Sequence, residues 1–158
     1  MATYSAEGGS AGVVMRPPFL YGGGFIVVLV LRWLWPLPIV GNGGPLWAAL
    51  ALPIVGIAIV VPAARTLRAA GTNVDPLLPT TAIVTAGPYR FSRNPIYVGL
   101  TLLYLGLALT FNTWWAVIVL VPILAVMHVG VVRREDRYLE QKFGEPYRQF
   151  CSRVRRYL

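Results

Sequence analysis

Residues 95–132 read PIYVGLTLLYLGLALTFNTWWAVIVLVPILAVMHVGVV, two long apolar runs divided by Asn112. We assign the runs to residues 95–111 and 113–133, because a helix that spans a bilayer needs about 20 mostly apolar residues. So short a link between two helices requires them to run antiparallel. The stretch therefore predicts a helical hairpin across a membrane.

Two further apolar runs, at residues 18–38 and 45–64, precede the hairpin. The chain is 56% hydrophobic and 13% charged, whereas soluble domains average about 25% charged residues. The sequence therefore predicts an all-α fold, an integral membrane helical bundle of about four transmembrane helices. We expect a single domain over residues 1–158, with a mobile Gly/Ser-rich leader at residues 1–17.

Apart from Arg32, the basic residues fall on one side of the four predicted spans. The loop between the second and third spans carries four arginines, and the tail from Arg133 to Arg156 carries eight basic residues. The other two connections, residues 41–44 and Asn112, carry none. Because basic loops stay on the cytoplasmic side, we expect both termini in the cytoplasm and the protein in the inner membrane.

The net charge of +8 fits contact with anionic membrane lipids, and nucleic acid is not an expected partner. The chain has one cysteine and one histidine. An internal disulfide is therefore excluded, and no metal site is expected.

The tail, residues 134–158, is predicted to form cytoplasmic helices. The first continues from the fourth span and ends at Gly144, since glycine is favoured just past a helix end. The second begins near Pro146, and its apolar residues recur at helical spacing: Tyr147, Phe150, Cys151, Val154 and Leu158. This amphipathic helix is expected to lie either on the membrane or on the helical bundle.

Residues 87–99, GPYRFSRNPIYVG, are polar for the start of a transmembrane helix. Asn94 and Pro95 suit the N-cap and the first helical position. The free N–H groups of that helix end, with Arg90 and Arg93 beside them, predict a site for a carboxylate or a phosphate. The alternative is that these arginines only meet lipid phosphates.

Two adjacent acids, Glu135 and Asp136, follow the fourth span. The hairpin returns residues 133–136 to the membrane edge where residues 90–97 lie, so arginines and carboxylates are expected to converge. His128 precedes Glu135 by seven residues and so lies on a similar helix face. The alternative is that the acids form surface ion pairs with nearby arginines.

Two stretches on either side of the hairpin carry a family resemblance. They read GTNVDPLLPTTAIVTAGPYRFSRNPIYVG (residues 71–99) and REDRYLEQKFGEPYRQFCSRVRRYL (residues 134–158). Their elements, in order, are GPYR, R-N-P-x-Y-x-G, and an acidic pair followed by L-x-x-x-F-G-x-x-Y. Together they closely resemble the superfamily of isoprenylcysteine carboxyl methyltransferases and phospholipid N-methyltransferases, over residues 71–158.

The resemblance implies a small helical membrane enzyme that binds S-adenosylmethionine at the cytoplasmic face and methylates a lipophilic acceptor from the bilayer. Matched onto this chain, it implies catalytic roles for Arg93, Glu135 and Asp136. Together with the charge pattern, it gives these expected cofactor contacts: Arg90, Asn94, Pro95, Tyr97, Gly99, His128 and Tyr147. Many members of the superfamily have His in place of Asn94 and two glutamates in place of Glu135-Asp136.

Two other functions stay open at this point. One is an NADPH-linked sterol-type reductase, whose C-terminal region is related. The other is a non-enzymatic membrane protein whose basic tail recruits anionic lipid. The methyl acceptor is also open: an amine or thiol needs a base such as Glu135 or Asp136, whereas a carboxylate needs only a cation such as Arg93 to orient it.

Overall fold

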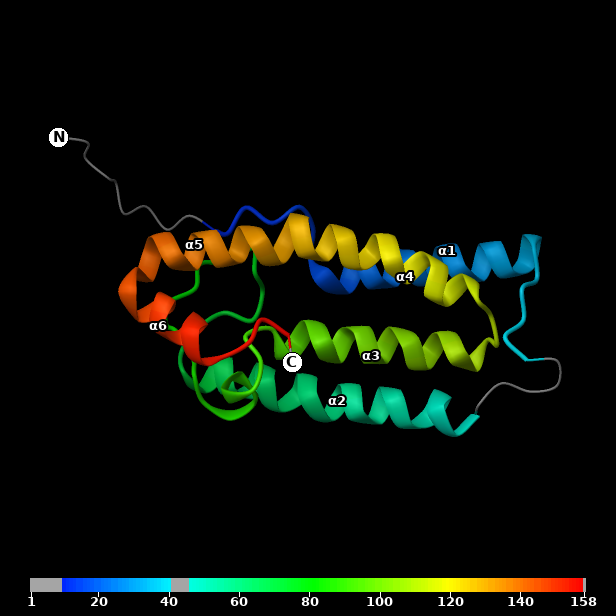
Figure 1. The fold of residues 1–158 in the computed structure, drawn as a ribbon, viewed down its shortest axis with the longest axis horizontal. Helices are drawn as coiled ribbons and strands as arrows, with labels where there is room; N and C mark the ends of the chain where they lie inside the picture. The colour runs from blue at the N-terminus through cyan, green and yellow to red at the C-terminus, as the bar shows by residue number, and fades with distance from the viewer. Residues whose placement is uncertain (1–9, 41–45, 158) are drawn as a thin grey trace.

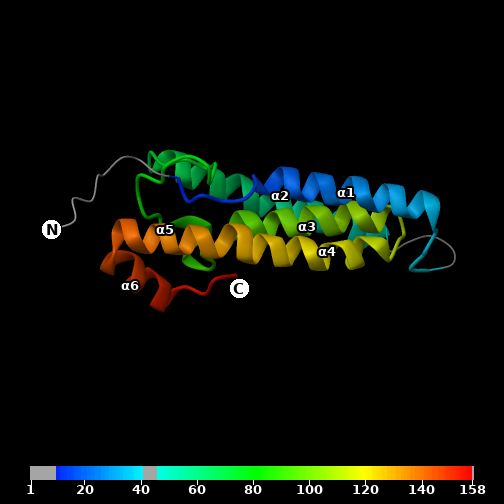
Figure 2. The ribbon, with the colours of Figure 1, turned by 90° about the horizontal axis from the view of Figure 1, so that it is seen from above.

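The computed structural model describes residues 10–40 and 46–157, and its regular secondary structure there is entirely helical (Figure 1). The helices, in chain order, are α1 (Pro17–Leu34), α2 (Leu46–Ala69), the 3₁₀ helix η1 (Gly87–Arg90), α3 (Pro95–Thr110), α4 (Trp115–Val126), the π-helical turn η2 (Met127–Val132), α5 (Arg133–Phe143) and α6 (Glu145–Arg153). The long helices lie side by side as a bundle (Figures 1 and 2). The predicted all-α fold class is therefore confirmed.

Helices α2 and α3 form a tight antiparallel pair because small residues face each other where they meet. A methyl group on Gly99 would lie 2.8 Å from the main-chain oxygen of Gly56, and one on Gly106 would collide with the ring of Pro53. Only glycine allows the two backbones to approach so closely. Such close packing stabilises helix pairs in lipid, where the hydrophobic effect gives no driving force.

Helices α1 and α4 form the second pair, with Gly24 of α1 against the side chain of Ile123. The predicted hairpin of α3 and α4 is present, and it turns at Asn112 with a positive φ of 47°, which asparagine tolerates better than most residues. The bundle interior is formed by residues from α1, α3, α4 and η2: Tyr21, Val28, Tyr104, Ala108, Ala116, Leu120, Ile123 and Met127.

Helices α4, η2 and α5 run as one continuous rod, Trp115–Phe143, of 29 residues. At 1.5 Å per residue the rod is about 44 Å long, whereas the hydrocarbon core of a bilayer is about 30 Å thick. The charged helix α5 therefore projects beyond the apolar layer. At the π-helical turn, the main-chain oxygen of Gly130 accepts a hydrogen bond from the N–H of Val14 at 3.1 Å.

Three helices are long and apolar enough to cross a membrane: Pro17–Leu34, Ala49–Ala69 and Trp115–Phe143. The chain is thus an integral membrane protein. The fourth apolar helix, α3, has 16 residues, fewer than the roughly 20 of a typical span, although it lies along α2 (Figure 1). A fourth complete span, and with it the placement of both termini in the cytoplasm, stays a prediction.

The helix boundaries differ from the predicted ones at two places. Helix α1 ends at Leu34 rather than at residue 38, because Pro36 and Pro38 disfavour helical angles in the residues before them. Helix α2 continues past residue 64 to Ala69.

Part of the predicted mobile leader lies against the bundle. The side chain of Val13 is buried in the core, and residues 10–16 follow the rod. The remaining residues of the leader, 1–9, and the connection at residues 41–44 lie outside the described residues.

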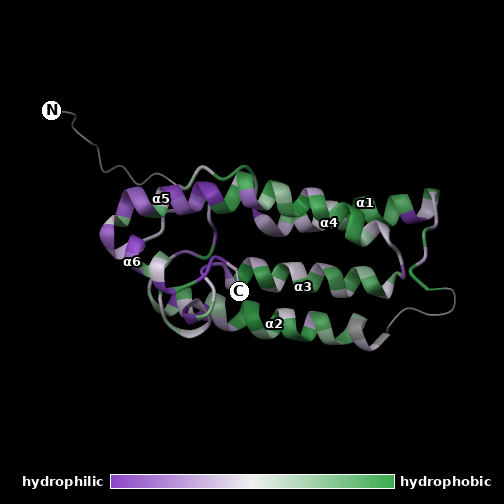
Figure 3. Cartoon of the chain, viewed as in Figure 1, coloured by the Kyte–Doolittle hydropathy of each residue, from purple (hydrophilic) through white to green (hydrophobic). Residues whose placement is uncertain are grey.

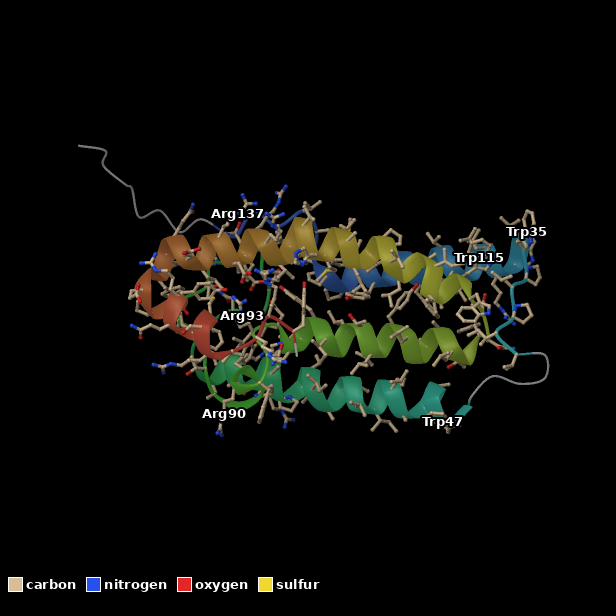
Figure 4. The ribbon with its side chains drawn as sticks, in the orientation of Figure 1. Trp35, Trp47, Arg90, Arg93, Trp115 and Arg137 are labelled. Carbon is tan, nitrogen blue, oxygen red and sulfur yellow. The ribbon has the colours of Figure 1, made fainter. Side chains whose placement is uncertain are left out.

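The two ends of the bundle differ in composition. Trp35, Trp47 and Trp115 lie at one end, which we call the tryptophan end (Figure 4). Arg90 and Arg93 lie at the other, which we call the arginine end (Figure 4). The hydropathy of the chain follows this division, since α2, α3 and α4 are mostly apolar and α5 and α6 are mostly hydrophilic (Figure 3).

Candidate active site

A cavity of about 90 Å³ lies at the arginine end, between the N-terminal end of α3 and helices α5 and α6. The loop of residues 71–86 and helix η1 complete its walls. The expected convergence of residues 90–97 with residues 133–136 is observed here. The polar side chains of the lining are Asn73, Thr80, Tyr89, Arg93, Asn94, Tyr97, Glu135, Asp136 and Tyr147.

Helix α6 closes one side of the cavity with its apolar face. The buried rings of Tyr147 and Phe150 pack in one cluster with Val84 and Tyr89. This amphipathic helix was expected to lie either on the membrane or on the helical bundle, and in the structure it lies on the bundle. Its entry follows the sequence signal, since Gly144 ends α5 with a positive φ of 60°.

Asp136 is the centre of a charged cluster. The hydroxyl of Tyr147 donates a hydrogen bond to its Oδ1 at 2.5 Å. Arg93 Nη1 lies 3.6 Å from Oδ1, and Arg156 Nη2 lies 2.9 Å from Oδ2. Burial, together with the bond to Asp136, raises the pKa of Tyr147. The phenol therefore stays protonated and acts as a donor.

The cluster contains three buried polar atoms that have no hydrogen-bond partner among the described residues: Arg93 Nε, Asp136 Oδ2 and Arg156 Nε. Oδ2 of Asp136 thus has an ionic contact with Arg156 but no well-directed hydrogen bond. An unsatisfied buried polar atom costs about 1–3 kcal/mol, and native proteins contain few of them. Such a cluster is typical of a site whose polar groups are completed by a ligand.

Glu135 binds the first turn of α3. The hydroxyl of Tyr97 donates to its Oε2 at 2.7 Å. The main-chain oxygen of Tyr97 accepts from the hydroxyl of Thr101 at 2.9 Å, and that hydroxyl lies 2.7 Å from the hydroxyl of Tyr21. A line of polar groups therefore runs from the cavity into the bundle towards α1.

Asn94 occupies the N-cap position of α3, as predicted, but its side chain does not cap the helix. Its Nδ2 donates instead to the main-chain oxygen of Arg156 at 3.0 Å. The N–H of Arg93 donates to the main-chain oxygen of Arg155 at 3.0 Å. The end of α3 beside the cavity is therefore held by the residues that follow α6.

Three of the expected site residues lie outside the cavity lining. Arg90 is exposed and points away from α5 (Figure 4). Gly99 lies in the contact with Gly56 of α2. His128 Nδ1 lies 2.9 Å from the hydroxyl of Tyr157.

The lining also contains polar residues that sequence reasoning did not single out, namely Asn73, Thr80 and Tyr89. They belong to the loop and to η1. The loop is tied to the start of α1 by an ion pair between Asp75 Oδ2 and Arg16 Nε at 2.7 Å. The signal for these three residues was their place within residues 71–99, the first of the two stretches that carry the family resemblance.

Comparison with known proteins places the chain in a family. The phospholipid methyltransferase family matches residues 45–146, from the start of α2 to the first turn of α6. The chain belongs to the phospholipid methyltransferase family. The matched region contains Arg93, Glu135 and Asp136.

Two relatives of this phospholipid methyltransferase family member match shorter stretches. The cobalt-zinc-cadmium resistance protein CzcN of Cupriavidus metallidurans is 40% identical over 63 residues, which are 40% of this chain and 29% of that protein. An uncharacterized protein of Haemophilus influenzae is 33% identical over 63 residues, 40% of this chain and 100% of that protein. The matched stretch thus spans less than a third of the Cupriavidus protein. No solved structure matches the chain.

Proposed function

We propose that this protein transfers a methyl group from S-adenosylmethionine to a lipophilic acceptor at the cytoplasmic face of the membrane. The proposal is carried by one observation: Arg93 and the acidic pair Glu135–Asp136, from segments far apart in the sequence, line the same cavity. The family supports methyl transfer in a membrane. The donor, the acceptor and the membrane face are our inference.

The charges of the lining match those of the donor, which has a carboxylate, an ammonium and a sulfonium. Arg93, beside the first turn of α3, is suited to the carboxylate. Glu135 or Asp136 is suited to the ammonium, and the ring of Tyr97 to the sulfonium. The unpartnered Arg93 Nε and Asp136 Oδ2 support this fit.

The cavity is smaller than such a ligand requires. Its volume is about 90 Å³, whereas small-molecule sites commonly enclose about 300–1,000 Å³. Binding of the donor therefore requires part of the wall to move.

When bound, S-adenosylmethionine supplies a methyl group on a positively charged sulfur. The residues of the site hold the acceptor in line with that methyl group, and such positioning accounts for much of the rate. For a lipid amine, Glu135 or Asp136 takes the proton that the acceptor loses. For an isoprenylcysteine-like carboxylate no base is needed, and Arg93 orients the acceptor.

An apolar hollow of about 180 Å³ between α1 and α3 supports a lipophilic acceptor. Tyr21 lines this hollow, and its hydroxyl contacts Thr101, one turn along α3 from Tyr97. A hydrocarbon chain in the hollow would direct the polar group of the acceptor towards the cavity.

The name of the Cupriavidus relative concerns metal resistance, and we do not extend metal binding to this chain. Residues 10–40 and 46–157 contain no group of three or more His, Cys, Asp or Glu side chains that could hold a metal ion.

Calorimetric titration of the detergent-purified protein with S-adenosylmethionine and with NADPH tests the proposal. We expect the first to bind and the second not to bind. Glu135→Gln should weaken S-adenosylmethionine binding roughly tenfold or more, because it removes a negative charge from the lining and from the partner of Tyr97, the ring proposed to meet the sulfonium. Glu140→Gln is the matched control, since Glu140 is half exposed and pairs with Arg148.

Other outcomes of the titration would favour other functions. Binding of NADPH alone would favour a sterol-type reductase. Binding of neither compound would favour a non-enzymatic membrane protein. An equal loss of S-adenosylmethionine affinity in Glu135→Gln and Glu140→Gln would show that Glu135 does not contact the donor.

A further inference from the structure

Residues 154–157 form a non-helical segment beside the site, which we call the strap (Figure 1, at the C-terminal end). Val154 leaves α6 with extended backbone angles. Two main-chain oxygens of the strap, those of Arg155 and Arg156, accept hydrogen bonds from Arg93 N–H and Asn94 Nδ2, each at 3.0 Å. The strap is therefore fastened to the N-terminal end of α3.

The strap is also fastened to the rod. The hydroxyl of Tyr157 lies 2.9 Å from His128 Nδ1, and Arg156 Nη2 lies 2.9 Å from Asp136 Oδ2. It thus bridges the two elements that carry the arginine and the carboxylates of the site.

The side chain of Arg156 occupies a position that a bound cation would take. Asp136 faces two guanidinium groups, Arg93 on one carboxylate oxygen and Arg156 on the other. The second contact is incomplete, because Arg156 Nε and Asp136 Oδ2 are buried without a hydrogen-bond partner among the described residues. A ligand ammonium, with three donors on one nitrogen, satisfies a carboxylate oxygen in more directions than this guanidinium does.

We propose that the strap is an internal latch: Arg156 competes with the ammonium group of the methyl donor for Asp136, and donor binding displaces the strap. The latch rests on the proposed function and deepens it. The latch assigns Asp136 as the residue that binds the ammonium group of the donor. It also implies that the donor binds poorly while the strap is closed.

The strap holds the lining residues Arg93, Asn94 and Asp136 from outside the cavity, and among the described residues no hydrogen bond joins residues 155–157 to one another. The loop of residues 71–86, which does line the cavity, is held by internal hydrogen bonds such as Asn73 Nδ2 to the oxygen of Pro79 and Thr81 Oγ1 to the oxygen of Gly71, both at 2.8 Å. The remaining walls are packed helices. Because the cavity must widen to admit the donor, release of the strap disturbs the least structure.

Arg156→Gln tests the latch by removing the competing charge. We expect S-adenosylmethionine to bind roughly tenfold more tightly, because the apparent affinity is proportional to the fraction of molecules in the open state, and a latch that leaves about one tenth of them open lowers it about tenfold. Arg148→Gln is the control, since it removes an exposed arginine of α6 and should leave binding unchanged.

Hydrogen exchange followed by mass spectrometry supplies a readout independent of activity. The peptide containing Arg93, whose N–H donates to the strap, should exchange faster in Arg156→Gln than in the natural protein. It should also exchange faster when the natural protein is saturated with S-adenosylmethionine. The control variant Arg148→Gln should exchange like the natural protein, both without the donor and when saturated with it.

The outcomes separate the latch from the proposed function. Weaker or unchanged donor binding by Arg156→Gln overturns the latch alone, since the natural protein still binds the donor. Absence of donor binding in the natural protein and in both variants overturns the proposed function.

Tyr157→Phe keeps the test available if Arg156→Gln does not fold, as judged by circular dichroism. It removes only the hydroxyl that meets His128. Donor binding should tighten roughly twofold to fivefold, since a single neutral hydrogen bond is lost from the closed state. Weaker or unchanged binding in this variant also overturns the latch.

Discussion

At the tryptophan end of the bundle, polar side chains bind the main chain of neighbouring segments, whereas at the arginine end charged and phenolic side chains also bind one another. The indole N–H of Trp115 donates to the main-chain oxygen of Trp35 at 2.7 Å. Asn112 bonds the main chain of Ile39 and Val40 through three hydrogen bonds. These contacts join the residues after α1 to the turn between α3 and α4.

At the arginine end, the corresponding contacts pair charged and phenolic groups from different elements. Tyr97 binds Glu135, Tyr147 binds Asp136, and Arg93 lies beside the same aspartate. Many polar side chains could form the hydrogen bonds to the main chain at the tryptophan end. The pairs at the arginine end, in contrast, each require one particular acidic residue and one particular tyrosine or arginine.

The difference separates structure from function. Bonds from side chain to main chain hold a turn in place and leave nothing for a ligand. The arginine end instead leaves Arg93 Nε and Asp136 Oδ2 buried without a hydrogen-bond partner among the described residues. Since native proteins satisfy most buried polar groups, the incomplete end is the one that we expect to bind a ligand.

The largest effect is expected for Arg93→Ala, measured by calorimetric titration with S-adenosylmethionine. Truncating one partner of a buried charge pair typically costs 2–5 kcal/mol, so we expect donor binding to weaken by roughly 30-fold or more. Arg90→Ala is the matched variant, because Arg90 is exposed outside the cavity. A greater loss of donor affinity in Arg90→Ala than in Arg93→Ala would show that Arg90, and not Arg93, binds the donor carboxylate.

Much of the fold could be predicted because apolar runs and short links constrain helices strongly. The hairpin around Asn112 and the end of α5 at Gly144 both follow from local signals. The end of α1 was predicted at residue 38 and lies at Leu34, although its signal, Pro36 and Pro38, is present in the sequence. The tight pairing of α2 with α3 could not be predicted, because a glycine in one helix does not reveal which glycine it will face.

The candidate site was predictable where charge and helix direction determine it. Glu135 and Asp136 meet Arg93 because the hairpin returns to the same edge. The side chain of Asn94 was expected to cap α3, yet it binds the main chain of Arg156, a contact between residues far apart in the sequence. Long-range contacts of this kind have no periodic or local signal.

A smaller effect, confined to stability, is expected at the tryptophan end for Asn112→Ala. It leaves the main chain of residues 39 and 40 without its partners, which costs about 1–3 kcal/mol. The thermal midpoint in detergent should fall, while S-adenosylmethionine binding should stay within about twofold.

Asn112→Asp sharpens this test, because it keeps the accepting oxygen and loses only the donation from Nδ2 to Val40. Its thermal midpoint should lie between those of Asn112→Ala and the natural protein. Loss of donor binding in proportion to loss of stability would show that the two ends are not independent.

The smallest effect is expected for Asn94→Ala, because two consequences oppose each other. The variant loses a neutral contact beside the donor, worth about 1 kcal/mol, or roughly fivefold in affinity. It also loses the bond that holds the strap at the oxygen of Arg156, which favours donor binding. Calorimetric titration should therefore show a loss of less than about fivefold in Asn94→Ala, and a larger loss when the same change is made in Arg156→Gln, where the strap is already released. If Asn94→Ala instead lost more affinity than Arg93→Ala, the donor carboxylate would depend on the asparagine, and Arg93 would be left as a structural partner of Asp136.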